Sequence, residues 1–201
     1  MSLLMETIQI LNGQVQRLDY HNDRLNRSRN QLMCSHADIY LEDYLQIPDA
    51  YKNGMVKCRV FYGQDVDLVD FEPYLPKCFT RFQLKEIEFD YAFKYVDRSA
   101  FNQLKSDLPS STELILTKDG VVTDTTFSNL VFQHRDGKWF TPRQPLLEGT
   151  QREFLLDEEV IEERNILAKD LKSYTHFKLI NAMLGFDESE VYSIQLIENR
   201  F

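Results

Sequence analysis

The chain has 201 residues, of which 43% are hydrophobic and 12% aromatic, and its formal net charge is -9. This composition predicts a globular protein with packed cores. The acidic balance, without any basic block, argues against a nucleic-acid or anionic-membrane partner. The apolar runs are shorter than the about 20 residues that cross a bilayer. Three cysteines without paired spacing, and a start unlike a signal peptide, predict a cytoplasmic protein.

The first third of the chain predicts a small α/β domain. A strand over 5–10 is followed by Asn12-Gly13, which supplies the positive backbone angles of a hairpin turn, and then by a second short strand. Leucines spaced among polar residues predict an amphipathic helix over 18–33. Residues 55–62 and 66–71 are expected to be paired strands that complete this domain.

Two prolines, Pro73 and Pro76, interrupt both the strand and the helix patterns. They predict a small domain over 1–74, a linker over 75–79 and a larger domain over 80–201. The mixed order of elements in the larger domain predicts an α+β fold built on a β-barrel-like sheet. Its expected strands are 81–86, 113–117, 121–124, 129–133, 138–141, 160–167 and 177–182, and its expected helices are 101–108, 150–158 and 170–174.

The sequence lacks the motifs of several common binding sites. The seven glycines form neither a dinucleotide-binding nor a P-loop pattern. The four histidines lack the spacing of metal ligands, so no metal site is predicted. Any phosphate must therefore be bound by a local site of another kind.

Five stretches appear in a characteristic order. They are Phe93–Arg98 around Lys94, Val121–Leu130, Thr141-Pro142-Arg143, Leu147–Arg152, and Leu179–Met183. Together they resemble the fold-type IV pyridoxal-phosphate enzymes, also called class IV aminotransferases. That group contains branched-chain and D-amino-acid aminotransferases and aminodeoxychorismate lyase. The resemblance implies a two-domain enzyme that binds pyridoxal 5'-phosphate between its domains and pairs as a homodimer.

The resemblance also assigns roles to residues. Lys94 would form the internal aldimine and act as the acid/base at the amine-bearing carbon. Asp124 would pair with the pyridinium nitrogen, where the family normally has the longer glutamate. Arg59 lies in an apolar strand, where an inward-facing arginine needs an anionic partner, and the resemblance makes that partner the cofactor phosphate. A second motif, around His21 and Arg24, resembles one in the family's small domain and is interpreted as helix packing.

Backbone groups would complete the phosphate site. The N–H groups of Thr150 and Gln151 begin a helix, whose dipole favours a dianion, and Gly149 permits its close approach. Further contacts would come from the backbone around Ala182 and Met183. The family prefers isoleucine and threonine where this chain has Thr150 and Gln151, so one hydroxyl contact is expected to be absent.

Two stretches favour the lyase within this group. Lys94–Arg98 resembles the lyase's K-x-x-N-R, and Asn181-Ala182-Met183 resembles its N-[AS]-L-M. The leading hypothesis is a folate-pathway lyase that converts 4-amino-4-deoxychorismate to 4-aminobenzoate and pyruvate by elimination. Arg98 and Arg143 are the predicted partners of the substrate carboxylates. A branched-chain or D-amino-acid aminotransferase and a non-catalytic homologue are the alternatives.

Overall fold

A computed structural model describes residues 3–198, and contacts between residues divide the chain into two compact units. The first unit contains the chain up to Pro76 together with Phe93–Asp97. The second contains Lys77–Ala92 and the chain from Arg98 onward. The segment with Lys94, which the sequence placed in the larger domain, therefore has its contacts in the first unit. Within 3–198, every helix is too short or too polar to span a membrane.

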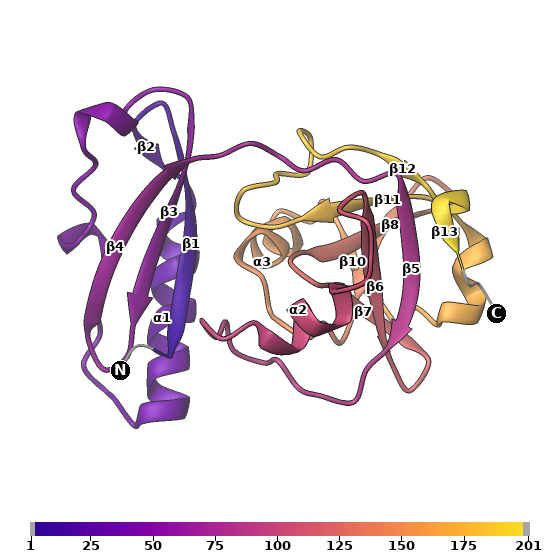
Figure 1. The fold of residues 1–201 in the computed structure, drawn as a ribbon, viewed down its shortest axis with the longest axis horizontal. Coiled ribbons are helices and arrows are strands. Elements are labelled where there is room, and N and C mark those ends of the chain that lie inside the picture. The colour runs from indigo at the N-terminus through magenta and orange to yellow at the C-terminus, as the bar shows by residue number, and fades with distance from the viewer. Residues whose placement is uncertain (1–2, 199–201) are drawn as a thin grey trace. The chain divides into compact units, whose positions relative to one another are not determined.

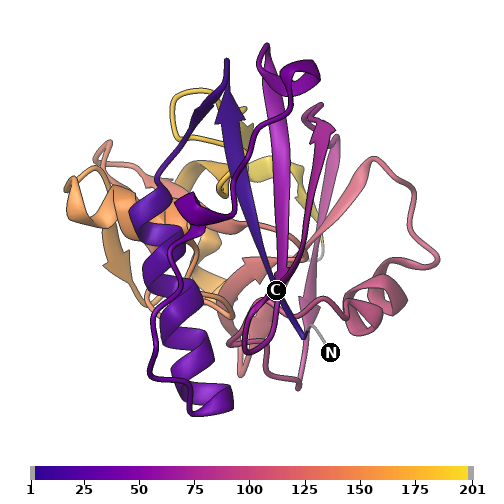
Figure 2. The same cartoon turned by 90° about the vertical axis from the view of Figure 1, so that its left-hand side faces the viewer.

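The first unit is an antiparallel sheet with one helix on one of its faces (Figures 1 and 2). The predicted turn at Asn12-Gly13 is confirmed, because both residues have positive φ, 49° and 80°. The strand order is β2-β1-β3-β4. The bounds are β1 Leu4–Leu11, β2 Gln14–Val15, α1 Leu18–Met33, β3 Met55–Tyr62 and β4 Val66–Pro73.

The apolar core of this unit lies between the sheet and α1. Alternate residues of β1 and β3 point into it, and Leu25 is the α1 leucine that it buries completely. Leu32, which the helical pattern assigned to the apolar face, is 40% exposed. The buried face of α1 is instead largely polar and includes His21, Arg24 and Arg29. A helix with this face needs polar partners on the sheet beneath it.

The segment Phe93–Asp97 extends the sheet of the first unit along the outer edge of β1. Leu4 and Tyr95 form an antiparallel bridge, the Met5 amide donates to the Lys94 carbonyl at 3.0 Å, and the Val96 amide donates to the Leu3 carbonyl at 3.0 Å. The backbone on both sides of Lys94 is therefore fixed.

The second unit divides its strands between two sheets and confirms the predicted α+β class. The five-stranded sheet has the order β10-β9-β8-β11-β12, and the four-stranded sheet has the order β13-β5-β6-β7. The bounds are β5 Arg81–Glu86, α2 Ser99–Lys105, β6 Thr112–Lys118, β7 Val121–Thr125, β8 Asn129–His134, β9 Trp139–Pro142, α3 Thr150–Asp157, β10 Glu162–Arg164, β11 Tyr174–Ile180, β12 Tyr192–Ser193 and β13 Ile197–Glu198.

Two predicted elements differ from those observed. The strand predicted over 160–167 is only three residues long. The helix predicted over 170–174 is a 3-10 helix, Ala168–Ser173, and Tyr174 already begins β11. Tyr174 is buried and lies opposite His134 of β8, so tertiary packing decides its conformation.

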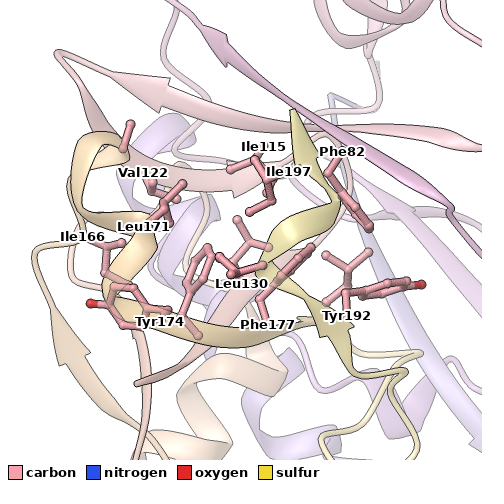
Figure 3. Close-up of a cluster of buried hydrophobic side chains, with 14 of the residues drawn as sticks. Phe82, Ile115, Val122, Leu130, Ile166, Leu171, Tyr174, Phe177, Tyr192 and Ile197 are labelled. Carbon is pink, nitrogen blue, oxygen red and sulfur yellow. The ribbon is translucent and has the colours of Figure 1, made fainter. Parts of the chain in front are cut away.

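Aromatic side chains join the two sheets of the second unit. Phe82 of β5 meets Phe177 of β11 and Tyr192 of β12 in edge-to-face contacts, each with ring centroids 4.8 Å apart (Figure 3). Such pairs contribute about 0.5–1.5 kcal/mol each beyond the area that they bury.

Candidate active site

In the first unit, Lys94 lies close to a buried polar network. Its side chain is half-buried, and its positive charge helps to lower the pKa of His21. His21 and Glu6 are completely buried, with His21 Nδ1 2.6 Å from Glu6 Oε2. Arg24 donates to both oxygens of the same carboxylate, Nε to Oε1 at 3.0 Å and Nη2 to Oε2 at 2.5 Å. The predicted lysine therefore sits beside an ordered group of charges.

The ionisation of this network follows from its burial. Burial alone disfavours the Glu6 carboxylate, but Arg24 and His21 outweigh it and hold the pKa of Glu6 at about 2. Burial lowers the pKa of His21, and the charges of Arg24 and Lys94 add to that lowering, against the Glu6 carboxylate. His21 is accordingly neutral near pH 7 and donates its Nδ1 proton to Glu6.

Sequence reasoning had noted His21 and Arg24 but missed Glu6. The available signal was a single carboxylate inside the apolar run of β1, which requires an internal partner.

Arg59 lies on β3 with its guanidinium already neutralised. Arg59 Nη2 is 2.6 Å from Asp70 Oδ2 and 3.3 Å from Glu72 Oε2, both on β4. The alternating burial of β3 puts Arg59 on the opposite face of the sheet from the buried residues of that strand, and its side chain is 32% exposed. For Arg59 to hold a phosphate, as predicted, it would have to exchange one of these carboxylates for the ligand.

In the second unit, Asp124 lies next to the last residue of β7 and is a buried carboxylate. Burial raises its pKa to about 6, against the opposing effects of the Leu147 amide, the Asn129 side chain and the charge of Arg152. The Leu147 amide donates to Oδ2 at 3.0 Å, and Asn129 Nδ2 donates to Oδ1 at 2.8 Å. A buried carboxylate of raised pKa gains from a cationic hydrogen-bond donor, which a protonated pyridine nitrogen would be.

The first turn of α3 carries the predicted phosphate-binding residues. Gly149 is the N-cap, and a Cβ there would lie 2.0 Å from Asn129 Oδ1, so a larger residue would force the Asn129 side chain to move. Thr150 and Gln151 are buried. Gln151 Oε1 has no hydrogen-bond partner in the described part of the chain, although the residue is 2% exposed. This oxygen is an acceptor, so only a hydrogen-bond donor could pair with it, whereas the backbone N–H groups of the turn are the donors that suit a phosphate.

The predicted turn after β11 is tightly hydrogen-bonded. Asn181 Oδ1 accepts from the Met183 amide at 2.8 Å and from the Leu184 amide at 3.1 Å, and Ala182 and Met183 are buried. The Met183 amide is thus engaged by Asn181. Any contact of this turn with a phosphate would need another backbone group or a change in that hydrogen bond.

The two arginines predicted to bind the substrate carboxylates differ in their contacts and exposure. Arg98 Nη2 donates to the Thr126 carbonyl, and its guanidinium lies 4.8 Å from the Phe101 ring centroid and 5.7 Å from that of Tyr91. These contacts link the start of α2 to the loop after Asp124. Arg143 has an exposed side chain, while its backbone amide donates to the Arg164 carbonyl at 3.0 Å. Of the two, Arg143 is the more accessible cation.

A lysine on an ordered edge segment, a buried carboxylate and a helix N-terminus are features that suit the amine-binding, ring-nitrogen and phosphate parts of a pyridoxal-phosphate site. Residues 90–186 match the family described as amino-transferase class IV. The chain belongs to this family of pyridoxal-phosphate-dependent enzymes.

Relatives cover nearly the whole chain. A curated but uncharacterized protein of Haemophilus influenzae is 37% identical over 187 residues, which are 90% of this chain and 98% of that protein. A solved structure from Haemophilus somnus, described as a candidate 4-amino-4-deoxychorismate lyase, is 32% identical with a TM-score of 0.84, covering 92% of this chain and 98% of its own. A candidate amino-acid aminotransferase from Mesorhizobium loti is 25% identical with a TM-score of 0.78, covering 90% and 95%.

Proposed function

We propose that this enzyme is a 4-amino-4-deoxychorismate lyase, which forms 4-aminobenzoate and pyruvate. The observation that carries the proposal is the similarity to the Haemophilus somnus protein, which has higher identity and a higher TM-score than the amino-acid aminotransferase. The reaction is an elimination. The ring loses a proton and the enolpyruvyl group leaves as the ring becomes aromatic, so no oxo acid is consumed.

When bound, pyridoxal phosphate supplies an electron sink for the carbanion at the amine-bearing carbon. Lys94 would hold the cofactor through its amine, yield that place to the substrate amine, and then move the proton at the amine-bearing carbon. The ordered backbone around Lys94 limits the positions that its amine can reach. A general acid/base works best when it is held within hydrogen-bond reach of the proton.

Asp124 would accept a hydrogen bond from the ring nitrogen and keep that nitrogen protonated. Its burial excludes water from the contact, which strengthens the pairing of opposite charges. The backbone N–H groups of Thr150 and Gln151 at the start of α3 would hold the phosphate. Arg143, as an exposed cation, is proposed to bind a substrate carboxylate.

The direct test is an assay without any oxo acid. Purified protein is incubated with pyridoxal phosphate and aminodeoxychorismate, and 4-aminobenzoate and pyruvate are measured, with Lys94→Ala as the matched variant. Equal amounts of both products from the wild type, and none from the variant, are expected. If the protein binds the cofactor but releases no product, the lyase assignment is wrong.

The second candidate is an aminotransferase for a branched-chain or D-amino acid, favoured by the similarity to the Mesorhizobium loti protein. It would require a 2-oxo acid for turnover, so an amino-acid and oxo-acid panel separates it from the lyase. A non-catalytic homologue would show no cofactor absorbance band that depends on Lys94. Homodimerisation and a cytoplasmic location stay predictions.

A further inference from the structure

Asn129 connects the elements of the second unit that carry the predicted cofactor residues. It begins β8 and is 5% exposed. Its backbone pairs with Ile180, the last residue of β11, just before the Asn181–Leu184 turn. Its side chain contacts the end of β7, the segment before α3, and Gly149 at the α3 N-cap.

The hydrogen bonds of Asn129 form a closed ring. Asn129 Nδ2 donates to Asp124 Oδ1 at 2.8 Å and to the Leu147 carbonyl at 2.8 Å. The Leu147 amide donates to Asp124 Oδ2 at 3.0 Å. Both amide hydrogens of Asn129 are used, and each oxygen of Asp124 faces a different donor. Two donors on two oxygens fix the plane of the carboxylate.

The oxygen of the Asn129 side-chain amide faces Gly149, the N-cap of α3, where the phosphate is predicted to bind. This atom, Oδ1, occupies the space where a side chain at Gly149 would begin. The amide thus contacts Asp124 on one side and the N-cap of α3 on the other. A ligand bound by Asp124 at one end and by the start of α3 at the other would therefore have both contacts altered by a change at Asn129.

We propose that Asn129 is a positioning residue for the cofactor, setting the spacing between the acceptor for the ring nitrogen and the helix N-terminus that takes the phosphate. This inference rests on the proposed binding of pyridoxal phosphate. Asn129 touches neither the reacting atoms nor the substrate in this role. It acts through Asp124, Leu147 and Gly149.

The test compares Asn129→Ala and Asn129→Leu with Thr141→Val in the full chain. Asn129→Leu keeps nearly the volume and removes the donor without adding a charge beside Asp124, so it serves if the alanine variant does not fold. Thr141 is also completely buried in the second unit, and its hydroxyl donates to the Leu130 carbonyl at 2.9 Å. Thr141→Val therefore controls for the loss of one buried hydrogen bond elsewhere in the unit.

Two readouts are needed. The first is exchange of the Leu147 amide hydrogen in cofactor-free protein, which should be about 10- to 100-fold faster in the Asn129 variants than in Thr141→Val, as expected for loss of a hydrogen bond to a charged group. The second is the ratio of affinities for pyridoxal phosphate and for pyridoxal, which lacks the phosphate. This ratio should fall in the Asn129 variants and stay at the wild-type value in Thr141→Val.

The outcomes separate the two proposals. Wild-type protein that binds pyridoxal phosphate, with Asn129 variants that match Thr141→Val in both readouts, overturns the role of Asn129 alone. Wild-type protein that does not bind pyridoxal phosphate overturns the proposed function and, with it, this role. Faster Leu147 exchange together with a lower affinity ratio supports both.

Discussion

At the scale of single residues, the buried carboxylate of Asp124 lowers the free energy of unfolding at neutral pH. Its carboxylate is buried among neutral hydrogen-bond donors, and no ion pair to it is formed in the described chain. Its pKa of about 6 means that the folded protein holds a proton more tightly there than the unfolded chain does. A cation that binds beside Asp124 would recover the energy lost on burial.

Asp124→Asn should change how stability depends on pH. Because the folded pKa is raised from 3.8 to about 6, the stability present below pH 3.8 is lost as pH rises through 6. That loss is about 3 kcal/mol by pH 8. The new amide nitrogen would face either Asn129 or Leu147, a cost that does not vary with pH. Urea denaturation of cofactor-free protein should therefore show the free energy of unfolding of the variant rising relative to that of the wild type by about 2–3 kcal/mol between pH 4 and pH 8. A difference that stays constant with pH would contradict the buried charge.

At the scale of elements, α1 is held on its sheet by an ion pair as well as by apolar packing. The contact of Arg24 and His21 with Glu6 lies between α1 and β1, and every member is buried. Removing one partner of such a group leaves a buried charge without compensation, which costs far more than losing an exposed pair.

Glu6→Gln should accordingly destabilise the protein by about 3–5 kcal/mol. Glu72→Gln is the control, because Glu72 also pairs with an arginine but its side chain is 40% exposed. That change should cost about 1 kcal/mol or less. Denaturation midpoints of the two variants at pH 7 measure the difference, and equal midpoints would show that the Glu6 network contributes no more than a surface pair.

Most elements could be predicted because their local patterns agree with their packing. The bounds of α1, β3 and β5 follow from periodicity alone, and Asn12-Gly13 fixes the first turn. Periodicity was misleading at Leu32, because polar residues and not leucines cover the sheet there. The residues around 160–174 were harder, since short strands at sheet edges owe their conformation to distant partners.

The candidate site could be predicted in type but not in contacts. The motifs predict Lys94, Asp124 and the start of α3 as site residues, because their roles depend on the type of residue at each position. The partners of Arg59 and Arg98 could not be foreseen, because β4 and the Thr126 carbonyl meet them only through the tertiary fold. Asn129 appears in the motif, yet its ring of hydrogen bonds depends on Leu147, which is 18 positions away.

At the scale of the whole molecule, the chain enters the first unit twice. Residues up to Pro76 form most of it, and Phe93–Asp97 returns to complete the edge beside β1. The lysine predicted to do the chemistry lies on this returning segment. Its position therefore depends on a short stretch of backbone pairing.

Val96→Pro should weaken this pairing in the full chain, because proline has no N–H to donate to the Leu3 carbonyl. We expect the Met5 amide, which donates to the Lys94 carbonyl, to exchange its hydrogen about 10-fold faster, as for the loss of one hydrogen bond. Val96→Ala keeps the N–H and is the matched control. Equal exchange at Met5 in both variants would show that the edge pairing does not depend on this bond.

In the four-stranded sheet of the second unit, β5 is synthesised long before its neighbour β13. β13 pairs in parallel with β5, and Glu198 lies 115 positions after Gln83. Until β13 has emerged, the backbone of β5 at Phe82 and Gln83 lacks this partner, and unpaired groups at a sheet edge can pair with other chains. A nascent chain stalled between these strands is thus open to aggregation, and a premature stop codon just before Ile197 would make that exposure permanent.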